Sequence, residues 1–227
     1  MDAVILDCAR MSTREINAAL GELPDGARAR IVAPWGRHNL AVGLENRITV
    51  EIAGNAGYFI GGLCDGPEVI VDGFVGWSVG ENLMSGTVRV RGNASECAGA
   101  SAHGGTVVVE GDASSRAGIS LKGGTVLIGG DVGHMSGFMA QAGVLLVGGN
   151  AGHALGDSIY ETVIYVGGSI ASLGSDARVE ELTDDDVLTV KRLADRAGFD
   201  HIDPANVTRV ASARRLYNFD ALSHQRY

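Results

Sequence analysis

Residues 107–149 read VVVEGDASSRAGISLKGGTVLIGGDVGHMSGFMAQAGVLLVGG, which holds two copies of a nineteen-residue unit and the start of a third. Stepping outward by nineteen in both directions finds two glycine columns without any insertion. The first is Gly54, Gly73, Gly92, Gly111, Gly130, Gly149 and Gly168, and the second is Gly61, Gly80, Gly99, Gly118, Gly137 and Gly156. Two columns in phase indicate a repeat architecture rather than a mere excess of glycine.

Apolar residues keep the same register. One column reads Val50, Val69, Val88, Val107, Val126, Leu145 and Ile164, and the next reads Ile52, Val71, Val90, Val109, Ile128, Val147 and Val166. Because the two columns are two residues apart, they lie on one face of a strand. A unit this short fits one coil of a parallel β-solenoid. The sequence therefore predicts an all-β-dominated fold, a single-stranded right-handed parallel β-helix of about seven nineteen-residue coils over residues 48–175.

The two glycine columns are predicted to be the structural corners of these coils. A corner needs a positive φ or a close backbone approach, and glycine allows both because it has no Cβ. In five coils the residue after the first-column glycine is Asn55, Asn93, Asp112, Asp131 or Asn150. These residue types tolerate the left-handed conformation and hydrogen-bond local backbone, which suits a corner.

The N-terminal part departs from the repeat. Residues 1–47 predict a small α/β cap on the first coil, with two short strands around a helix. The helix is expected over Thr13–Leu20, because Ser12 and Glu15 form a capping box and Gly21 follows as the C-terminal stop. A cap here would cover an open sheet edge, which otherwise promotes aggregation.

The C-terminal part, residues 176–227, predicts a helix and a docking tail. The helix begins at Thr183 and ends at Gly198. Its apolar stripe is expected to comprise Val187, Leu188, Val190, Leu193 and Ala194. The tail is rich in basic and aromatic residues, which favours a docked segment: Arg214, Arg215, Tyr217, Phe219 and Tyr227.

One outward-facing column has an unusual composition. Between the two inward columns lie Glu51, Ile70, Arg89, Val108, Leu127, Leu146 and Tyr165. The last four are consecutive and apolar, unlike a solvated face. We therefore expect Val108, Leu127, Leu146 and Tyr165 to be covered, either by the C-terminal helix or by another subunit, and we take them as a candidate partner interface.

Composition excludes several classes of protein. The 227 residues carry a formal net charge of −9, which argues against nucleic acid or an anionic membrane as the main partner. No apolar run approaches the roughly 20 residues of a membrane span, and the first residues do not resemble a secretory signal. The three cysteines, Cys8, Cys64 and Cys97, are too widely spaced for a zinc site or a disulfide framework. We expect a cytoplasmic protein.

Candidate chemical groups are few. His134 and His153 are nineteen residues apart and therefore stack on adjacent coils, in a column that continues through Ser115 and Ser172. They could share a metal or an anion, but a metal site would need a third ligand, so the preferred interpretation is a corner ladder. Arg116 is expected to be solvated or at an interface. We predict no catalytic residue, no metal and no cofactor in this chain.

The iterated glycines, as in Gly111-Asp112-Ala113 through Gly118 and in Gly123-Gly124-Thr125, resemble the GXGXG domain. This domain is the C-terminal right-handed β-helix of the glutamate synthase large subunit, and a related domain forms one of the subunits of formylmethanofuran dehydrogenase. The resemblance covers about residues 36–175. The sequence shows neither the N-terminal cysteine of a class II amidotransferase nor a flavin-binding barrel, so it looks like a stand-alone version of the domain.

Three segments are similar to the stand-alone GXGXG subunit of N-methylglutamate synthases: residues 116–123, residues 133–143 and residues 155–161. The resemblance implies a hetero-oligomer with a class II amidotransferase-like subunit and an FMN-binding glutamate synthase-like subunit that also carries an iron–sulfur cluster. It implies the reaction of methylamine and glutamate to N-methylglutamate and ammonia. In this family the β-helix is implied to hold the other two subunits in register without supplying catalytic residues.

Other interpretations stay open at this point. The same solenoid could be the GXGXG-related subunit of a formylmethanofuran dehydrogenase, or a free-standing β-helix interaction module. An independent hexapeptide-type acyltransferase is disfavoured, because that fold needs six-residue sub-repeats and an eighteen-residue coil, whereas nineteen is kept here over seven coils.

Overall fold

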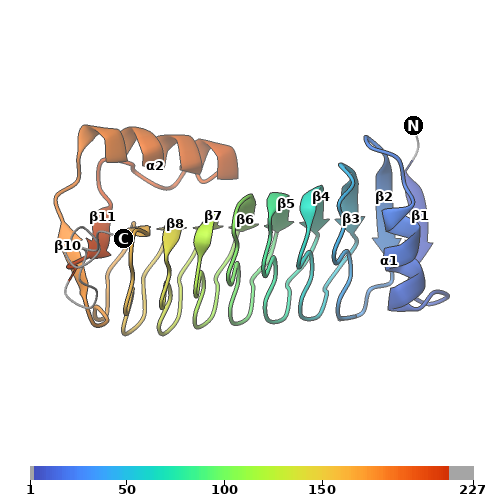
Figure 1. The fold of residues 1–227 in the computed structure, drawn as a ribbon, viewed down its shortest axis with the longest axis horizontal. Coiled ribbons are helices and arrows are strands. Elements are labelled where there is room, and N and C mark those ends of the chain that lie inside the picture. Colours follow the sequence, from blue (N-terminus) through green and yellow to red (C-terminus); the bar gives the residue numbers. More distant parts are fainter. Residues whose placement is uncertain (1–2, 215–227) are drawn as a thin grey trace, which may run out of the picture.

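The computed structural model describes residues 3–214 and shows a rod of stacked coils (Figure 1). Within these residues eleven strands form one sheet in the order β1-β2-β3-β4-β5-β6-β7-β8-β9-β11-β10. The strands of the repeat are β3 (Thr49–Ile52), β4 (Asp65–Val71), β5 (Ser85–Val90), β6 (Thr106–Val109), β7 (Lys122–Ile128), β8 (Ala142–Val147) and β9 (Val163–Val166). From β3 to β9, neighbouring strands of the repeat pair in parallel, which confirms the predicted parallel β-solenoid of about seven turns.

The pairing register follows the nineteen-residue repeat. Val88 pairs with Val107, and Val107 pairs with Val126, so like residues stack along the rod. Both predicted inward columns are fully buried. Each such aliphatic side chain contributes roughly 1.5–3 kcal/mol through burial. A second column of single parallel bridges runs through Val75, Ala94, Ala113, Val132, Ala151 and Ile170, and it gives the coil another wall.

The two glycine columns exist for different reasons. Every member of the second column has a positive φ, as Gly118 does at 69°. In the first column only Gly54 has one. The others are required by close approach between coils, because a Cβ built on Gly111 would lie 2.0 Å from Asn93 Oδ1. The predicted corner role therefore has two causes. The second column forms conformational corners, which need a positive φ, and the first column forms contact corners, which need room for the neighbouring coil.

Non-glycine residues also adopt the left-handed conformation at repeated positions. One column with positive φ consists of Phe59, Ser78, Cys97, Arg116, Met135 and Ala154, and another consists of Leu63, Asn82, Ser101, Ser120, Met139 and Ser158. This conformation costs roughly 1–2 kcal/mol for an L-residue, so the hydrogen bonds between coils hold it in place. Ser120, for example, donates its backbone N–H to the Phe138 carbonyl at 2.8 Å.

The N-terminal part comprises β1 (Val4–Asp7), α1 (Thr13–Gly21) and β2 (Arg28–Val32). The predicted Ser12–Glu15 capping box is present, but Gly21 is the last helical residue instead of the stop after the helix, and Glu22 caps the helix with a φ of −84°. Strand β2 joins the sheet by parallel pairing with β3. The coil that follows β2 is longer than nineteen residues, since Ile31 pairs with Ile52. A strict nineteen-residue step therefore did not reveal it.

The C-terminal part comprises β10 (Ala177–Glu180), α2 (Asp184–Ala197) and β11 (Thr208–Ser212). Helix α2 begins at a Thr183 capping box and ends at Gly198 with a φ of 78°, as predicted. Leu188 was wrongly placed in its apolar stripe, because that side chain is 65% exposed. The predicted docking residues Arg215, Tyr217, Phe219 and Tyr227 lie outside the described residues. In residues 3–214 neither helix has both the length and the apolar character of a bilayer span.

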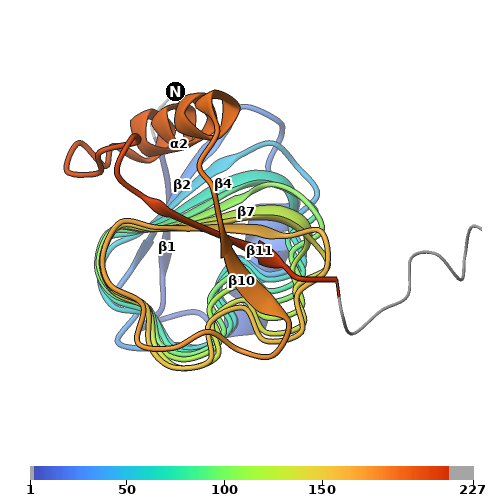
Figure 2. The same ribbon diagram turned by 90° about the vertical axis from the view of Figure 1, so that its left-hand side faces the viewer.

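Helix α2 covers the apolar outward column. Viewed along the rod, α2 lies outside the coils, above the strands of the sheet (Figure 2). Val108, Leu127, Leu146 and Tyr165 are buried against Val190, Leu193, Ala194 and Ala197 of this helix, and against the segment that follows it. Of the two predicted coverings, the structure shows the C-terminal helix. These four side chains therefore leave no exposed surface for a partner subunit, and the partner interface proposed for them was wrong.

Candidate partner interface

The exposed aromatic side chains of the first coils form the most unusual surface of the molecule. Both tryptophans of the chain are exposed, Trp35 by 80% and Trp77 by 62%. Tyr58 and Phe74, from neighbouring coils, are also exposed. Large aromatic side chains that contribute little to the core are typical of surfaces that bind other proteins. We call Trp35, His38, Tyr58, Phe74 and Trp77 the aromatic face.

Local geometry fixes the middle of the aromatic face. The rings of His38 and Tyr58 stack with centroids 3.9 Å apart, and the Tyr58 backbone N–H donates to His38 Nδ1 at 3.1 Å. Trp77 follows Tyr58 by nineteen residues and therefore occupies the same place on the next coil. These three residues, together with Gly57 and Gly76, line a hollow of about 300 Å³. The rings supply its apolar walls and the glycines add no side chain to fill it, which suits an inserted apolar side chain.

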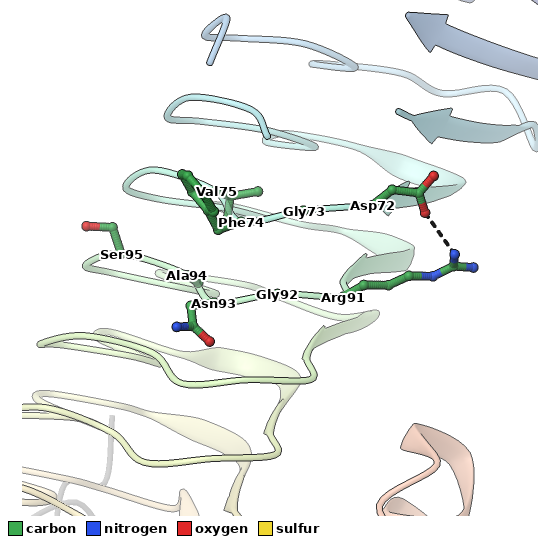
Figure 3. A pocket seen from close by; sticks show the side chains of 9 residues that line it. All are labelled: Asp72, Gly73, Phe74, Val75, Arg91, Gly92, Asn93, Ala94 and Ser95. Carbon is green, nitrogen blue, oxygen red and sulfur yellow. Dashed lines mark hydrogen bonds and ion pairs between the residues drawn. The ribbon is translucent and has the colours of Figure 1, made fainter. Parts of the chain in front are cut away.

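Two larger hollows lie on the same coils. The first has a volume of about 470 Å³ and is lined by Trp35 and Phe74 together with the segments 33–36 and 53–55. The second has a volume of about 600 Å³ and is lined by residues 72–75 and 91–95 (Figure 3). Phe74 belongs to both, so these two hollows meet at its side chain.

A chain of ion pairs borders this surface. Glu51 binds both Arg28 and Arg30, and Asp72 binds both Arg30 and Arg91. The shortest contacts are 2.8 Å, from Arg30 Nη1 to Glu51 and from Arg91 Nη1 to Asp72. Each of the two carboxylates is shared between two arginines, so charges alternate along this edge. Arg91 and Asp72, which both line the second hollow, therefore compensate each other's charge there.

The predicted residues His134 and His153 lie on the same exposed column as Tyr58 and Trp77, several coils further along. Both side chains are exposed, and His153 Nδ1 lies 3.3 Å from Ser172 Oγ. Within residues 3–214 no three side chains of the types His, Cys, Asp and Glu gather as metal ligands. Arg116 is half-buried in the left-handed column. A partner interface at these three residues stays a prediction.

Tyr165 has a structural role instead of an interfacial one. Its hydroxyl donates to Asp186 Oδ1, and burial together with that carboxylate raises the pKa of Tyr165. Asp186 also accepts from the Thr183 hydroxyl at 2.6 Å and from Arg209 Nε at 3.1 Å. Burial alone would raise the pKa of Asp186, but these hydrogen bonds outweigh it and lower that pKa to about 2. This polar cluster of Tyr165, Thr183, Asp186 and Arg209 holds α2 and β11 against the solenoid.

The cysteines show no activation. Cys64 is fully buried, its Sγ lies 3.1 Å from the Ala41 carbonyl, and burial raises its pKa to about 11. Burial also raises the pKa of Cys8 and of Cys97. A raised pKa disfavours the thiolate, which is the nucleophilic form. Cys64 is therefore a buried residue of the core instead of a nucleophile.

The aromatic face was missed in the sequence, although a signal was present. Only the histidine and serine members of one exposed column were considered in the sequence, namely Ser115, His134, His153 and Ser172. Further steps of nineteen toward the N-terminus pass Glu96 and reach Trp77 and then Tyr58. Those two aromatic residues replace small or polar ones at an exposed repeat position, and such a substitution marks a surface with a further use.

Comparison with known proteins gives one partial match. No family model matches the chain, and no solved structure matches it. Protein GlxC of Rhizobium meliloti (strain 1021) is 40% identical over 87 residues. These residues are 37% of this chain and 38% of that protein, so the match spans less than two fifths of either.

Proposed function

We propose that this chain is a non-catalytic scaffold subunit of a glutamate synthase-type multi-subunit enzyme, most specifically N-methylglutamate synthase. That reaction forms N-methylglutamate and ammonia from methylamine and glutamate. The solenoid holds a class II amidotransferase-like subunit and an FMN-binding synthase subunit in register. FMN and an iron–sulfur cluster belong to a partner subunit in this proposal, and the reacting groups lie outside this chain.

Two observations support the class of enzyme. The glycine columns and the segments around residues 116–161 resemble the GXGXG domain and its stand-alone versions. The similarity to Protein GlxC supports a glutamate synthase-like relationship, over the 87 residues that match. The choice of N-methylglutamate synthase rests on the resemblance alone.

The observation that carries the scaffold role is the aromatic face on a rigid rod. The solenoid already has a continuous buried core, so folding does not require Trp35 and Trp77 at the surface. Tryptophan and tyrosine are over-represented among the residues that dominate binding energy at protein interfaces. A stack of coils joined by hydrogen bonds also keeps its surfaces at fixed spacing, which is what a scaffold must provide.

Purification of the native protein through a tag on this chain tests the proposal. We expect a yellow, iron-containing complex with an amidotransferase-like chain and an FMN-binding chain. Production of N-methylglutamate from methylamine and glutamate identifies the specific enzyme. A colourless homo-oligomer with its own activity would overturn the scaffold role, and a molybdopterin-containing partner would point to formylmethanofuran dehydrogenase.

A paired substitution tests the aromatic face itself. Replacing Tyr58 and Trp77 by alanine should weaken assembly by at least about tenfold, as loss of an interface anchor does. Its matched control is Leu188→Ala, because Leu188 is equally exposed but lies on α2. Thermal unfolding of the isolated chain should barely change in either variant. Unchanged assembly in the paired variant would remove the aromatic face from the proposal.

A further inference from the structure

The hollow of about 300 Å³ on the aromatic face is bounded by rings and by glycines that the fold requires. The rings belong to His38, Tyr58 and Trp77, and the glycines are Gly57 and Gly76. A Cβ built on Gly57 would lie 1.9 Å from His38 Nδ1, and one on Gly76 would lie 2.8 Å from the Gly57 carbonyl carbon. Close packing between coils therefore excludes side chains at both glycine positions, and the three rings determine what the hollow can bind.

The neighbouring basic residues bring no positive charge into this hollow. The Tyr58 backbone N–H donates to His38 Nδ1, so this nitrogen carries no proton and the imidazole ring is neutral. Arg37 precedes His38, but its guanidinium donates to the backbone carbonyls of Met11 and Cys8 in the N-terminal part. Neither side chain therefore opposes the entry of a cation between the rings.

Two carboxylates lie near Trp77. Glu96 occupies the place of Trp77 on the next coil, where its carbonyl accepts the Ser78 backbone N–H at 2.9 Å. Glu81 follows Trp77 by four residues. Burial raises the pKa of Cys97, and Glu96 and Glu81 raise it further, which places both carboxylates near that thiol. Within residues 3–214 neither carboxylate forms an ion pair or a side-chain hydrogen bond, so both can accept a cation.

The surrounding charge also favours a cation. Arg116 lies on the coil after Cys97 and lowers the pKa of that thiol, but in the described part of the chain it forms no ion pair with Glu81 or Glu96. The whole chain has a net charge of −9, which favours basic partners. Aromatic faces attract cations through their electron-rich π-systems. Rings and carboxylates together therefore select a positive group that is carried on an apolar stem.

We propose that the hollow between Tyr58 and Trp77 binds an arginine side chain of a partner subunit. Its guanidinium lies against the Trp77 ring and donates to the Glu96 carboxylate, while its methylenes contact the apolar walls. Adjacent coils are about 4.8 Å apart, so one guanidinium reaches both groups. Arginine suits this site better than lysine, because its planar head stacks on rings and binds carboxylates with two parallel hydrogen bonds. The proposal rests on the proposed function, since a partner subunit supplies the arginine.

A titration of the isolated chain tests the preference for a cation. The probe is N-acetyl-L-arginine amide, and the matched control is N-acetyl-L-citrulline amide, which has nearly the same shape without the charge. Binding is followed by NMR at constant ionic strength, through the ring signals of Trp77 and Tyr58. We expect saturable shifts, with the arginine probe bound about two- to fivefold more tightly than the citrulline probe. Equal affinities, or no saturable shift with the arginine probe, would overturn the proposal.

Substitutions in the chain distinguish the ring from the carboxylate. Trp77→Phe keeps an aromatic face and should keep the preference for arginine, whereas Trp77→Leu keeps only apolar bulk and should reduce it. Glu96→Gln should weaken binding of the arginine probe about two- to fivefold and leave the citrulline probe unchanged. Asp200→Asn is the matched control, because it removes the same charge from an exposed position after α2. Equal losses in Glu96→Gln and Asp200→Asn would reduce the effect to net charge and refute the site.

The complex isolated through the tagged chain tests whether a partner subunit supplies the arginine. Glu96→Gln should weaken assembly about two- to fivefold at low salt, and high salt should narrow the difference from the parent protein. Asp200→Asn should assemble as the parent does. Assembly of Glu96→Gln equal to that of the parent would overturn the arginine assignment.

Failure of this inference can be told apart from failure of the proposed function. The titration uses the chain alone, so a negative titration overturns the arginine site and leaves the scaffold role to be judged by copurification. A homo-oligomer without partner chains would overturn the scaffold role, and with it the partner origin of the arginine, whatever the titration gave.

Discussion

The Tyr165 hydroxyl on β9 donates a hydrogen bond to the Asp186 carboxylate on α2. This contact joins the outward column of the solenoid to the helix that covers it. Thr183 and Arg209 bind the same carboxylate, so the helix start, the last solenoid strand and β11 meet at one side chain. Docking of α2 therefore depends on a buried polar cluster as well as on apolar packing.

Removing the Tyr165 hydroxyl should loosen that docking. Tyr165→Phe leaves the ring packed but deprives Asp186 of one donor, and we expect a loss of about 1–2 kcal/mol in the free energy of unfolding. Urea denaturation measures the loss. Tyr58→Phe is the control, because the Tyr58 ring is exposed and stacks on His38. Equal stability changes in both variants would contradict the assigned role of the cluster.

Acid should weaken the same cluster in a defined pH window. The pKa of Asp186 is lowered from 3.8 to about 2, so the ionised carboxylate favours the folded state. The resulting stabilisation, about 2 kcal/mol, is fully present above about pH 5 and is lost as the pH falls from about 4 to about 2. Unfolding free energies measured across this range should show a steeper acid dependence for the parent protein than for Asp186→Asn. Parallel pH profiles would refute the assignment.

Replacing glycine by alanine should destabilise the protein at both kinds of corner, but for different reasons. Gly111→Ala should cost more than about 2 kcal/mol, because its Cβ would collide with Asn93 Oδ1. Adding Asn93→Ala should recover part of that loss. Gly118→Ala should cost about 1–2 kcal/mol through its φ of 69°, since nothing lies closer than 3.8 Å to the new Cβ. Melting temperatures of the three variants distinguish the causes, and a full-size loss in the double variant would argue against the collision.

Glycine should stabilise the protein at a left-handed position that now holds another residue. Ser120 has a φ of 53°, so Ser120→Gly should raise the free energy of unfolding by roughly 0.5–1 kcal/mol. Ser114→Gly, on the same coil but without a positive φ, should give no gain. Chemical denaturation of both variants provides the comparison. A gain at Ser114 equal to that at Ser120 would rule out relief of backbone strain.

The solenoid could be predicted from the sequence because its columns repeat every nineteen residues without drift. Side chains that stack in the core, such as Val88, Val107 and Val126, must be similar in size and polarity. Packing of the interior therefore imposes the same residue types at every nineteenth position. The coil after β2 could not be found this way, because its longer loop shifts the pairing of Ile31 with Ile52. The two causes behind the glycine columns also stayed hidden, since φ and contact distances are properties of the folded backbone.

The candidate site was the harder part to foresee. A repeat directs attention to residues that are alike, whereas the aromatic face consists of residues that differ from their column. Tyr58 and Trp77 could have been noticed as departures, but their exposure and the stacking of His38 on Tyr58 required coordinates. Hydrogen bonds between coils, such as the one from the Asp112 backbone N–H to Asn93 Oδ1 at 3.0 Å, are also properties of the folded chain. Sequence reasoning expected only local hydrogen bonds there.

The antiparallel strands at the end of the sheet limit the growth of the rod. Strand β11 pairs antiparallel with β9, and β10 pairs antiparallel with β11, so the parallel register stops there. Because β11 occupies the edge of β9 and runs opposite to it, no further coil can pair with β9 and continue the parallel stack. The rod therefore has a fixed length, and its coils are spaced about 4.8 Å apart. Its gene sets the distance between anything bound at the aromatic face and the helix α2 by the number of coils that it encodes.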